Sequence, residues 1–280
     1  DYDDAIARGH DALTFARAAH DTTTIARTLG NIGCALTGSG KYREALDVFA
    51  EAEQFAVDLG AINWRARSTA MRGGLHLELF DFPGAELLAE EARELSRSGK
   101  WKHADISGGI DLVLNFTRRG EIDRAEQIVD ELVETIATAQ GAHGWLWRLR
   151  YAQAQAEIAA HRGDHERSLM WAESVIKQSR ALGRVKYEVA GLHGRALALD
   201  AQGNRHEGIV TLRAAVDRAR STHDPAMFLK PAASLLAVDG SDTLLAEARS
   251  AVARIIAALP HGIIVDRFQD ADPVRVITSF

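Results

Sequence analysis

The side chains best suited to hold a binding partner are arginines that stand three positions after an aromatic residue. Trp64 and Arg67 form one such pair, and Trp147 and Arg150 form another. Residues three apart lie on the same face of a helix, so each guanidinium can stack on the ring before it. Aromatic rings and guanidinium groups together suit an acidic or aromatic protein segment, which these pairs therefore predict as a partner.

Further polar groups fall on the same faces of the expected helices. The complete set of predicted partner-binding residues is Arg27, Trp64, Arg67, Trp147, Arg150, Gln153, Glu157, Tyr187 and His193. The alternative interpretation is that the rings only pack neighbouring parts of the chain together, as most buried tryptophans do. Substituting Arg67 and Arg150 by glutamate distinguishes the two, because only the packing interpretation predicts a loss of folding.

No arrangement of residues predicts a catalytic site. The sequence Gly38-Ser39-Gly40-Lys41 resembles the end of a phosphate-binding loop, but Ala35 and Tyr42 stand where that loop needs a glycine and a hydroxyl-bearing Ser or Thr. Cys34 has no histidine within helical reach. A helical hydrolase would find only Glu157 and Asp200 near the predicted binding wall. We therefore expect no catalytic residues and no cofactor.

The eleven histidines do not form a metal-binding pattern. His161 and His165 are four apart, but Gly163 between them indicates a turn rather than a shared helix face. Three more fall at expected turns or hairpin junctions: His143, His206 and His223. We expect all of these to be solvated loop residues, and we expect no metal.

Small residues recur at a nearly constant interval along the whole chain. They are Ala5, Ala45, Ala85, Ala125, Ser168, Gly208 and Ala248, which are forty residues apart except for one step of 43. None of the residues four and seven positions after each of them is polar, which places each trio on one face of a helix. The interval predicts helical hairpins, each a helix A and a helix B, which stack because one hairpin cannot bury its apolar face alone.

The segment 29–52 resembles a tetratricopeptide (TPR) repeat. It carries Leu29, a turn glycine at Gly40, Tyr42, Ala45 and Phe49 in the order of that pattern, although the interval exceeds the usual length of roughly 34 residues. The resemblance covers the whole chain. It implies an all-α solenoid that forms a right-handed superhelix with helix A on the concave side.

The expected domain organisation is a single array over residues 1–280. Residues 1–19 are expected to be the helix B of a truncated repeat, and residues 260–280 a short helical tail that caps the last apolar face. The hairpins between them are expected at about 22–60, 61–99, 100–140, 141–183, 184–223 and 224–259. The three extra residues of the long step are expected in a loop around 141–144. Two strands at 263–266 and 274–277 are an alternative for the tail.

The long interval and the tail are also similar to C-terminal regions of large bacterial signalling proteins that carry an ATPase with a cyclase or a LuxR-type domain. That resemblance implies a non-catalytic interaction or regulatory module, and the start at Asp1 without methionine suggests a fragment. The alternative is a sensor whose concave groove binds a small effector or peptide. The formal net charge of −6 disfavours nucleic acid as a partner, and no apolar run predicts a membrane span. The single cysteine is compatible with a cytoplasmic protein.

Overall fold

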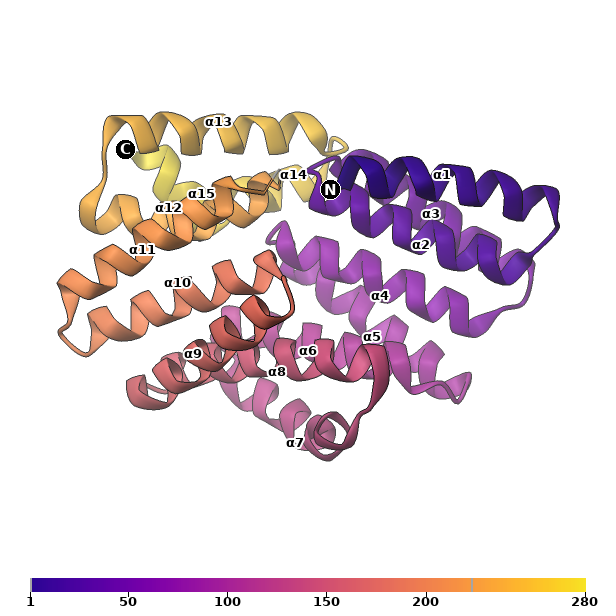
Figure 1. Ribbon diagram of the computed structural model, residues 1–280, viewed down its shortest axis with the longest axis horizontal. Helices are drawn as coiled ribbons and strands as arrows, with labels where there is room; N and C mark the ends of the chain where they lie inside the picture. The colour runs from indigo at the N-terminus through magenta and orange to yellow at the C-terminus, as the bar shows by residue number, and fades with distance from the viewer. Residues whose placement is uncertain (1, 223) are drawn as a thin grey trace.

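The computed structural model describes residues 2–222 and 224–280, except for the side chain of residue 142, and this part of the chain is all-α. Its fifteen helices are α1 (Tyr2–Ala18), α2 (Thr22–Gly38), α3 (Tyr42–Asp58), α4 (Ile62–Glu78), α5 (Phe82–Ser98), α6 (Lys102–Arg118), α7 (Ile122–Thr138), α8 (Gly141–His161), α9 (His165–Ala181), α10 (Val185–Ala201), α11 (Arg205–Arg220), α12 (Pro225–Asp239), α13 (Asp242–Ala258), α14 (Ile263–Gln269) and α15 (Asp272–Ser279). The helices pack in chain order as a helical repeat array, which confirms the predicted fold class (Figure 1).

The helices from α2 to α12 alternate between two layers. Each even-numbered helix packs against its two chain neighbours and also against the next even-numbered helix. The even-numbered helices, which are the predicted A helices, therefore form one continuous inner layer. The array descends from α1 to α7 and climbs back to α13, so its two ends meet at the top of Figure 1.

The recurring small residues lie where neighbouring helices approach each other. All of them are buried from Ala45 to Ala248, and only Ala5 is exposed, because no described helix precedes α1. Gly33 shows how close the approach is, since a Cβ atom there would overlap the ring of Phe49, which is itself 1% exposed. The small side chains thus allow the close stacking that their spacing predicts.

The longer step in the repeat has a different structural cause from the one predicted. Helix α8 has 21 residues, whereas its neighbours α7 and α9 have 17 each. Only residues 139 and 140 separate α7 from α8. The extra residues therefore lengthen the start of the helix, and the expected loop around 141–144 is wrong.

The tail forms two short helices rather than strands, so the strand alternative is wrong. Helix α15 packs against α12 and α13, where Val274 and Ile277 are buried. The tail therefore covers the last helices, as expected. Helix α14 also contacts the α4–α5 turn near the beginning of the array, which the sequence does not predict.

We call the junction between the two ends of the array the closing contact. Phe268 of α14 stacks on Phe80 of the α4–α5 turn with ring centroids 6.2 Å apart, and Arg267 forms an ion pair with Asp81 at 2.6 Å. Tyr42 at the start of α3 donates a hydrogen bond of 2.6 Å to Asp224, which caps α12. One buried apolar cluster runs across the junction, so the first and last repeats share a core.

The turn at Phe80 differs from its counterparts. The other turns from an A helix into its B helix up to α11 place glycine in the left-handed backbone region, as at Gly40 with φ 76°. Phe80 adopts φ 61° there although it has a Cβ atom, which is an unfavourable conformation for a bulky residue. Its side chain is 4% exposed against Phe268, so packing across the closing contact offsets the backbone strain.

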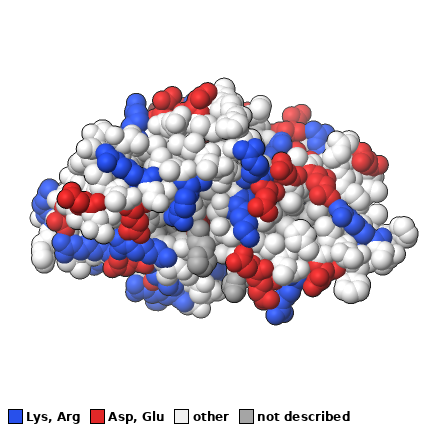
Figure 2. Space-filling model, turned by 90° about the horizontal axis from the view of Figure 1, so that it is seen from above, with Lys and Arg blue, Asp and Glu red and all other residues white. Residues whose placement is uncertain are grey.

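The face of the molecule drawn in Figure 2 carries charges of both signs. Figure 2 shows lysine and arginine side chains next to aspartate and glutamate side chains over that face, with uncharged areas between them. None of the described helices combines the length and the apolar character that crossing a bilayer requires.

Candidate functional site

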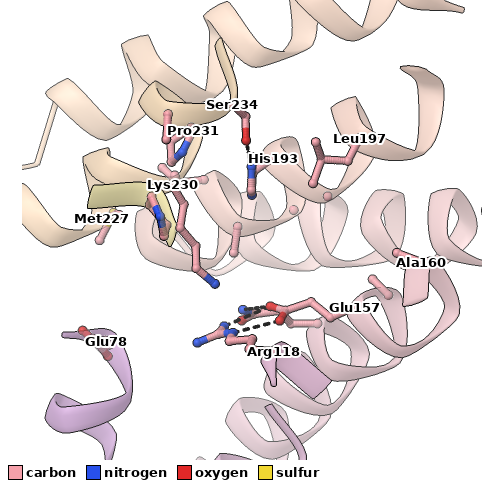
Figure 3. A pocket seen from close by; sticks show the side chains of 18 of the residues that line it. Glu78, Arg118, Glu157, Ala160, His193, Leu197, Met227, Lys230, Pro231 and Ser234 are labelled. Atoms are coloured by element: carbon pink, nitrogen blue, oxygen red, sulfur yellow. Dashed lines mark hydrogen bonds and ion pairs between the residues drawn. The ribbon is translucent and has the colours of Figure 1, made fainter. Parts of the chain in front are cut away.

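A pocket of about 610 Å³, partly open to solvent, lies beside the closing contact on the inner side of the array. Its walls come from the inner-layer helices α4, α6, α8, α10 and α12, with α9 and the tail completing them. Figure 3 shows charged side chains from α6, α8 and α12 that face one another across this space. Repeats far apart in the sequence therefore contribute to one site.

The floor of the pocket carries an ion pair with fixed geometry. Arg118 Nε and Nη2 each donate a hydrogen bond of 2.9 Å to a different carboxylate oxygen of Glu157. Gln153 Nε2 donates a further one, of 3.0 Å, to Glu157 Oε1. Burial alone would raise the pKa of Glu157, but Arg118, Lys230 and these hydrogen bonds outweigh it, so the pKa lies well below its ordinary value. Glu157 is therefore an anion whose hydrogen-bonding capacity is largely used.

Lys230 adds a second positive charge beside Glu157, which already pairs with Arg118. Its ammonium group points from α12 toward the Arg118–Glu157 pair in Figure 3. It lies over the ring of Phe80, 5.9 Å from the centroid, and it takes part in none of the hydrogen bonds or ion pairs of the described residues. Burial and the charge of Arg118 lower the pKa of Lys230 to about 8, so it is still mostly protonated at pH 7.

The remaining polar groups of the pocket are paired within the protein. His193 Nε2 lies 2.8 Å from the Ser234 hydroxyl, and burial together with Lys230 lowers the pKa of His193 to about 4, which leaves the ring neutral. Lys186 forms an ion pair with Glu78 at the α4 side. These contacts fix the polar side chains in place before any ligand enters.

The rest of the pocket lining is largely apolar. Phe80 and Phe82 come from the α4–α5 region, and Val189, Met227 and Val276 come from α10, α12 and α15. An apolar cavity with a few fixed polar groups is the usual form of a site for a small molecule. The arrangement can hold a ligand that has an apolar body and one charged end.

Three of the predicted partner-binding residues line this pocket: Gln153, Glu157 and His193. Arg27 is exposed on α2, and its carbonyl oxygen accepts a hydrogen bond from Arg67. Tyr187 is partly buried among apolar residues of α8 and α9. The structure therefore does not bring the whole predicted set together, because the other six residues do not line the pocket.

The two aromatic–arginine pairs differ in the structure. Arg67 lies over the ring of Trp64 at 5.5 Å, as predicted, and also hydrogen-bonds Asn31 at 3.0 Å. The second stack is absent among the described residues, because Arg150 forms an ion pair with Asp111 instead. Trp147 is 9% exposed, and its indole N–H donates a hydrogen bond of 3.1 Å to Ser107. The prediction of a Trp147–Arg150 stack is therefore wrong.

Aromatic rings form a ladder along the starts of the inner helices. Ring contacts join Trp64 to Trp101, Trp101 to His103, and His103 to both His143 and Trp147. His103 Nε2 lies 2.9 Å from His143 Nδ1, whereas His103 Nδ1 is buried without a hydrogen-bond partner among the described residues. The proton of a neutral His103 therefore belongs on Nε2, where it has an acceptor.

We expect His103 to make folding stability depend on pH. Burial, His143, Arg67 and Arg150 lower the pKa of His103 to about 3, against about 6.5 for an unfolded histidine. The unfolded chain binds the proton first, so the free energy of unfolding should fall as the pH drops from about 6.5 toward 3. His103→Gln should flatten this slope in denaturant titrations, and His206→Gln, an exposed histidine on α11, should leave it unchanged. An unchanged slope in His103→Gln would contradict the assignment.

His143 is not a loop residue, because it lies in the first turn of α8 and contacts His103 and Trp147. His161 and His206 are exposed as expected and His165 is partly exposed, but all three lie at helix ends rather than in loops. His223 lies outside the described residues. The phosphate-loop-like segment is a helix turn, as expected, in which Tyr2 packs on Gly38 and Lys41 forms an ion pair with Asp3.

The charged pocket residues on the A helices that the sequence did not single out include Glu78, Arg118, Lys186 and Lys230. They lie near the ends or on the inner faces of A helices. Their spacing in the sequence is the same as that of charged residues on solvent-exposed helix faces, so it does not identify them. The sequence does carry one indication of the closing contact. Among the A-to-B turns up to α11, the turn without glycine, at Phe80, is the one that contacts the tail.

No protein-family model matches this chain, and a comparison with curated proteins finds no match.

Proposed function

We propose that this chain is a TPR-like, non-catalytic regulatory module of a larger signal-transduction protein, and that it acts by binding a small effector inside its closed array. The observation that carries the proposal is the pocket of about 610 Å³ that the α4–α5 region, α6, α8, α9, α10, α12 and the tail line together. Its volume lies within the roughly 300–1,000 Å³ typical of small-molecule sites. The recurring small residues and the turn glycines support the TPR-like assignment.

The limited size of the pocket and the closing contact beside it support an effector over a large docking domain. The closing contact joins α14 to the α4–α5 turn, so the inner side is not an open groove along its whole length. A ligand that contacts α6, α10 and α12 at once would link distant repeats and stabilise their relative positions. Such a ligand would change what the array presents to neighbouring domains.

A pocket-filling substitution tests this function. Ala190 of α10 lines the pocket, so Ala190→Trp should occupy the space that a ligand needs. We expect the uncharged apolar dye Nile red to bind the native chain at one site and to lose at least about tenfold in affinity in Ala190→Trp. Fluorescence titration measures both, and bound dye should also raise Tm by mass action.

The matched control is Ala214→Trp, which places the same side chain at an exposed position of α11. It should bind the dye as the native chain does, and circular dichroism should give the same helix content for all three proteins. Equal dye binding by Ala190→Trp and the native chain would refute the pocket as the binding site.

A second candidate function is docking of an acidic or aromatic protein segment at Trp64 and Arg67. Their stacking contact and the exposure of neighbouring Arg27 favour it. Arg150→Glu is unsuitable as a test because it would put a carboxylate beside Asp111. Arg67→Glu alone should weaken binding of acidic synthetic peptides in a peptide array, and unchanged binding would exclude this surface.

A further inference from the structure

We propose that the pocket binds a monocarboxylate with an extended apolar body, whose carboxylate pairs with Lys230. The inference rests on the proposed function and adds the chemical class of the ligand. It follows from the charges that line the pocket, from the shape of its apolar walls and from the position of Lys230 between them.

The first step is that Lys230 lacks an anion of its own. The described lining holds two other permanent cations, and each has a carboxylate partner: Arg118 has Glu157, and Lys186 has Glu78. Glu157 already accepts three hydrogen bonds from Arg118 and Gln153. Lys230 therefore shares the charge of Glu157 with Arg118 and, among the described residues, has no carboxylate in direct contact. A desolvated cation whose charge is only partly compensated favours an anionic ligand group at this point.

The second step limits the ligand to one negative charge. Four carboxylates of the described residues also line the pocket, Glu78, Glu157, Asp224 and, at the tail, Asp272, so a second ligand charge would meet a negatively charged lining. A phosphate monoester carries about −1.5 to −2 at pH 7, whereas a carboxylate carries −1. Charge complementarity therefore favours a carboxylate over a phosphate.

The third step concerns the rest of the ligand. Val189 and Leu197 of α10, Met227 of α12 and Val276 of α15 give the pocket apolar walls on several sides of Lys230. The Phe80 ring lies beside the ammonium group and adds an apolar surface at the same end. A straight or ring-bearing hydrocarbon body fills such walls without leaving unpaired polar groups.

The test compares four probes with the same ten-carbon chain: decanoate, decyl phosphate, decanol and decyltrimethylammonium. Isothermal titration calorimetry below the micellar concentration of each probe measures binding to the whole chain. We expect decanoate to bind about tenfold or more tightly than each of the other three, since a charge-assisted contact contributes only with the matching monoanion. Lys230→Gln should remove this preference while leaving decanol binding unchanged.

Lys177→Gln on the exposed face of α9 is the control and should bind decanoate as the native chain does. Equal decanoate affinity in Lys230→Gln and the native chain would overturn the carboxylate assignment, as would tighter binding of decyl phosphate. Decanol binding that Ala190→Trp abolishes would then still support the pocket itself. Failure of Nile red and decanol to distinguish Ala190→Trp from Ala214→Trp would instead refute the proposed function.

Discussion

Phe268→Ala should lower the free energy of unfolding by about 3–5 kcal/mol, the range for removing a buried aromatic side chain. Phe268 is 0% exposed and stacks on Phe80, which belongs to a repeat nearly two hundred residues earlier in the chain. Its loss removes packing from both ends of the array at once. Urea denaturation followed by circular dichroism measures the change.

The control for this substitution lies on the same helix. Ile263 of α14 is 63% exposed, so Ile263→Ala should change the free energy of unfolding by less than about 0.5 kcal/mol. A double-mutant cycle with Phe80→Leu should give a coupling of about 0.5–1.5 kcal/mol, the usual range for an aromatic pair. If Phe268→Ala were no more destabilising than Ile263→Ala, the closing contact would not be an energetically important junction.

Glu157→Gln should destabilise the protein by about 2–3 kcal/mol at pH 7, because it leaves Arg118 without its counter-charge. The value is smaller than for a fully buried pair, since both side chains still touch the pocket. Replacing both partners, with Arg118→Met and Glu157→Leu together, should recover most of the loss. Denaturant titration of Arg118→Met, Glu157→Leu and the double variant measures the cycle.

The effect of Glu157→Gln should depend on pH. The folded protein holds the pKa of Glu157 well below its ordinary value, so its carboxylate stabilises the fold above about pH 4.3, the value for an unfolded glutamate. As the pH falls below that value, the contribution is progressively lost and the two proteins should converge in stability. Glu126→Gln removes an exposed pair with Arg162 and should change stability much less than Glu157→Gln does. A difference for Glu157→Gln that grew on acidification would contradict the assigned charge state.

The repeat array could be predicted from the sequence because its cause is local. A small residue every forty positions, as at Ala45 and Ala85, specifies where one helix approaches the next. Turn glycines such as Gly40 specify where the chain reverses. The start of α8 was misassigned because added residues can lengthen a helix or a loop, and their number alone does not decide between the two.

The closing contact could not be predicted in the same way. Tyr42 fits the repeat pattern as a packing residue, and its hydrogen bond to Asp224 joins positions 182 apart in the sequence. The curvature that brings the two ends together is the sum of small rotations over many repeats, which residue spacing does not encode.

The candidate site was predicted only in part for the same reason. Gln153, Glu157 and His193 were singled out because they lie on the inner faces of A helices. Lys230 lies on the inner layer as well, but its significance depends on Phe80 and Arg118, which belong to other repeats. A side chain's missing partner becomes visible only when all of its spatial neighbours are known.

The closing contact also changes how the molecule opens. In a linear array, each repeat touches only its neighbours, and the terminal units fray first. Here Tyr42 and Phe80 tie α3 and the α4–α5 turn to Asp224 and Phe268, so these early helices cannot open without breaking contacts of the late ones. Amide hydrogens of α3 and α12 should therefore exchange with solvent at similar slow rates, and the two joined regions should lose their structure in a single concerted event.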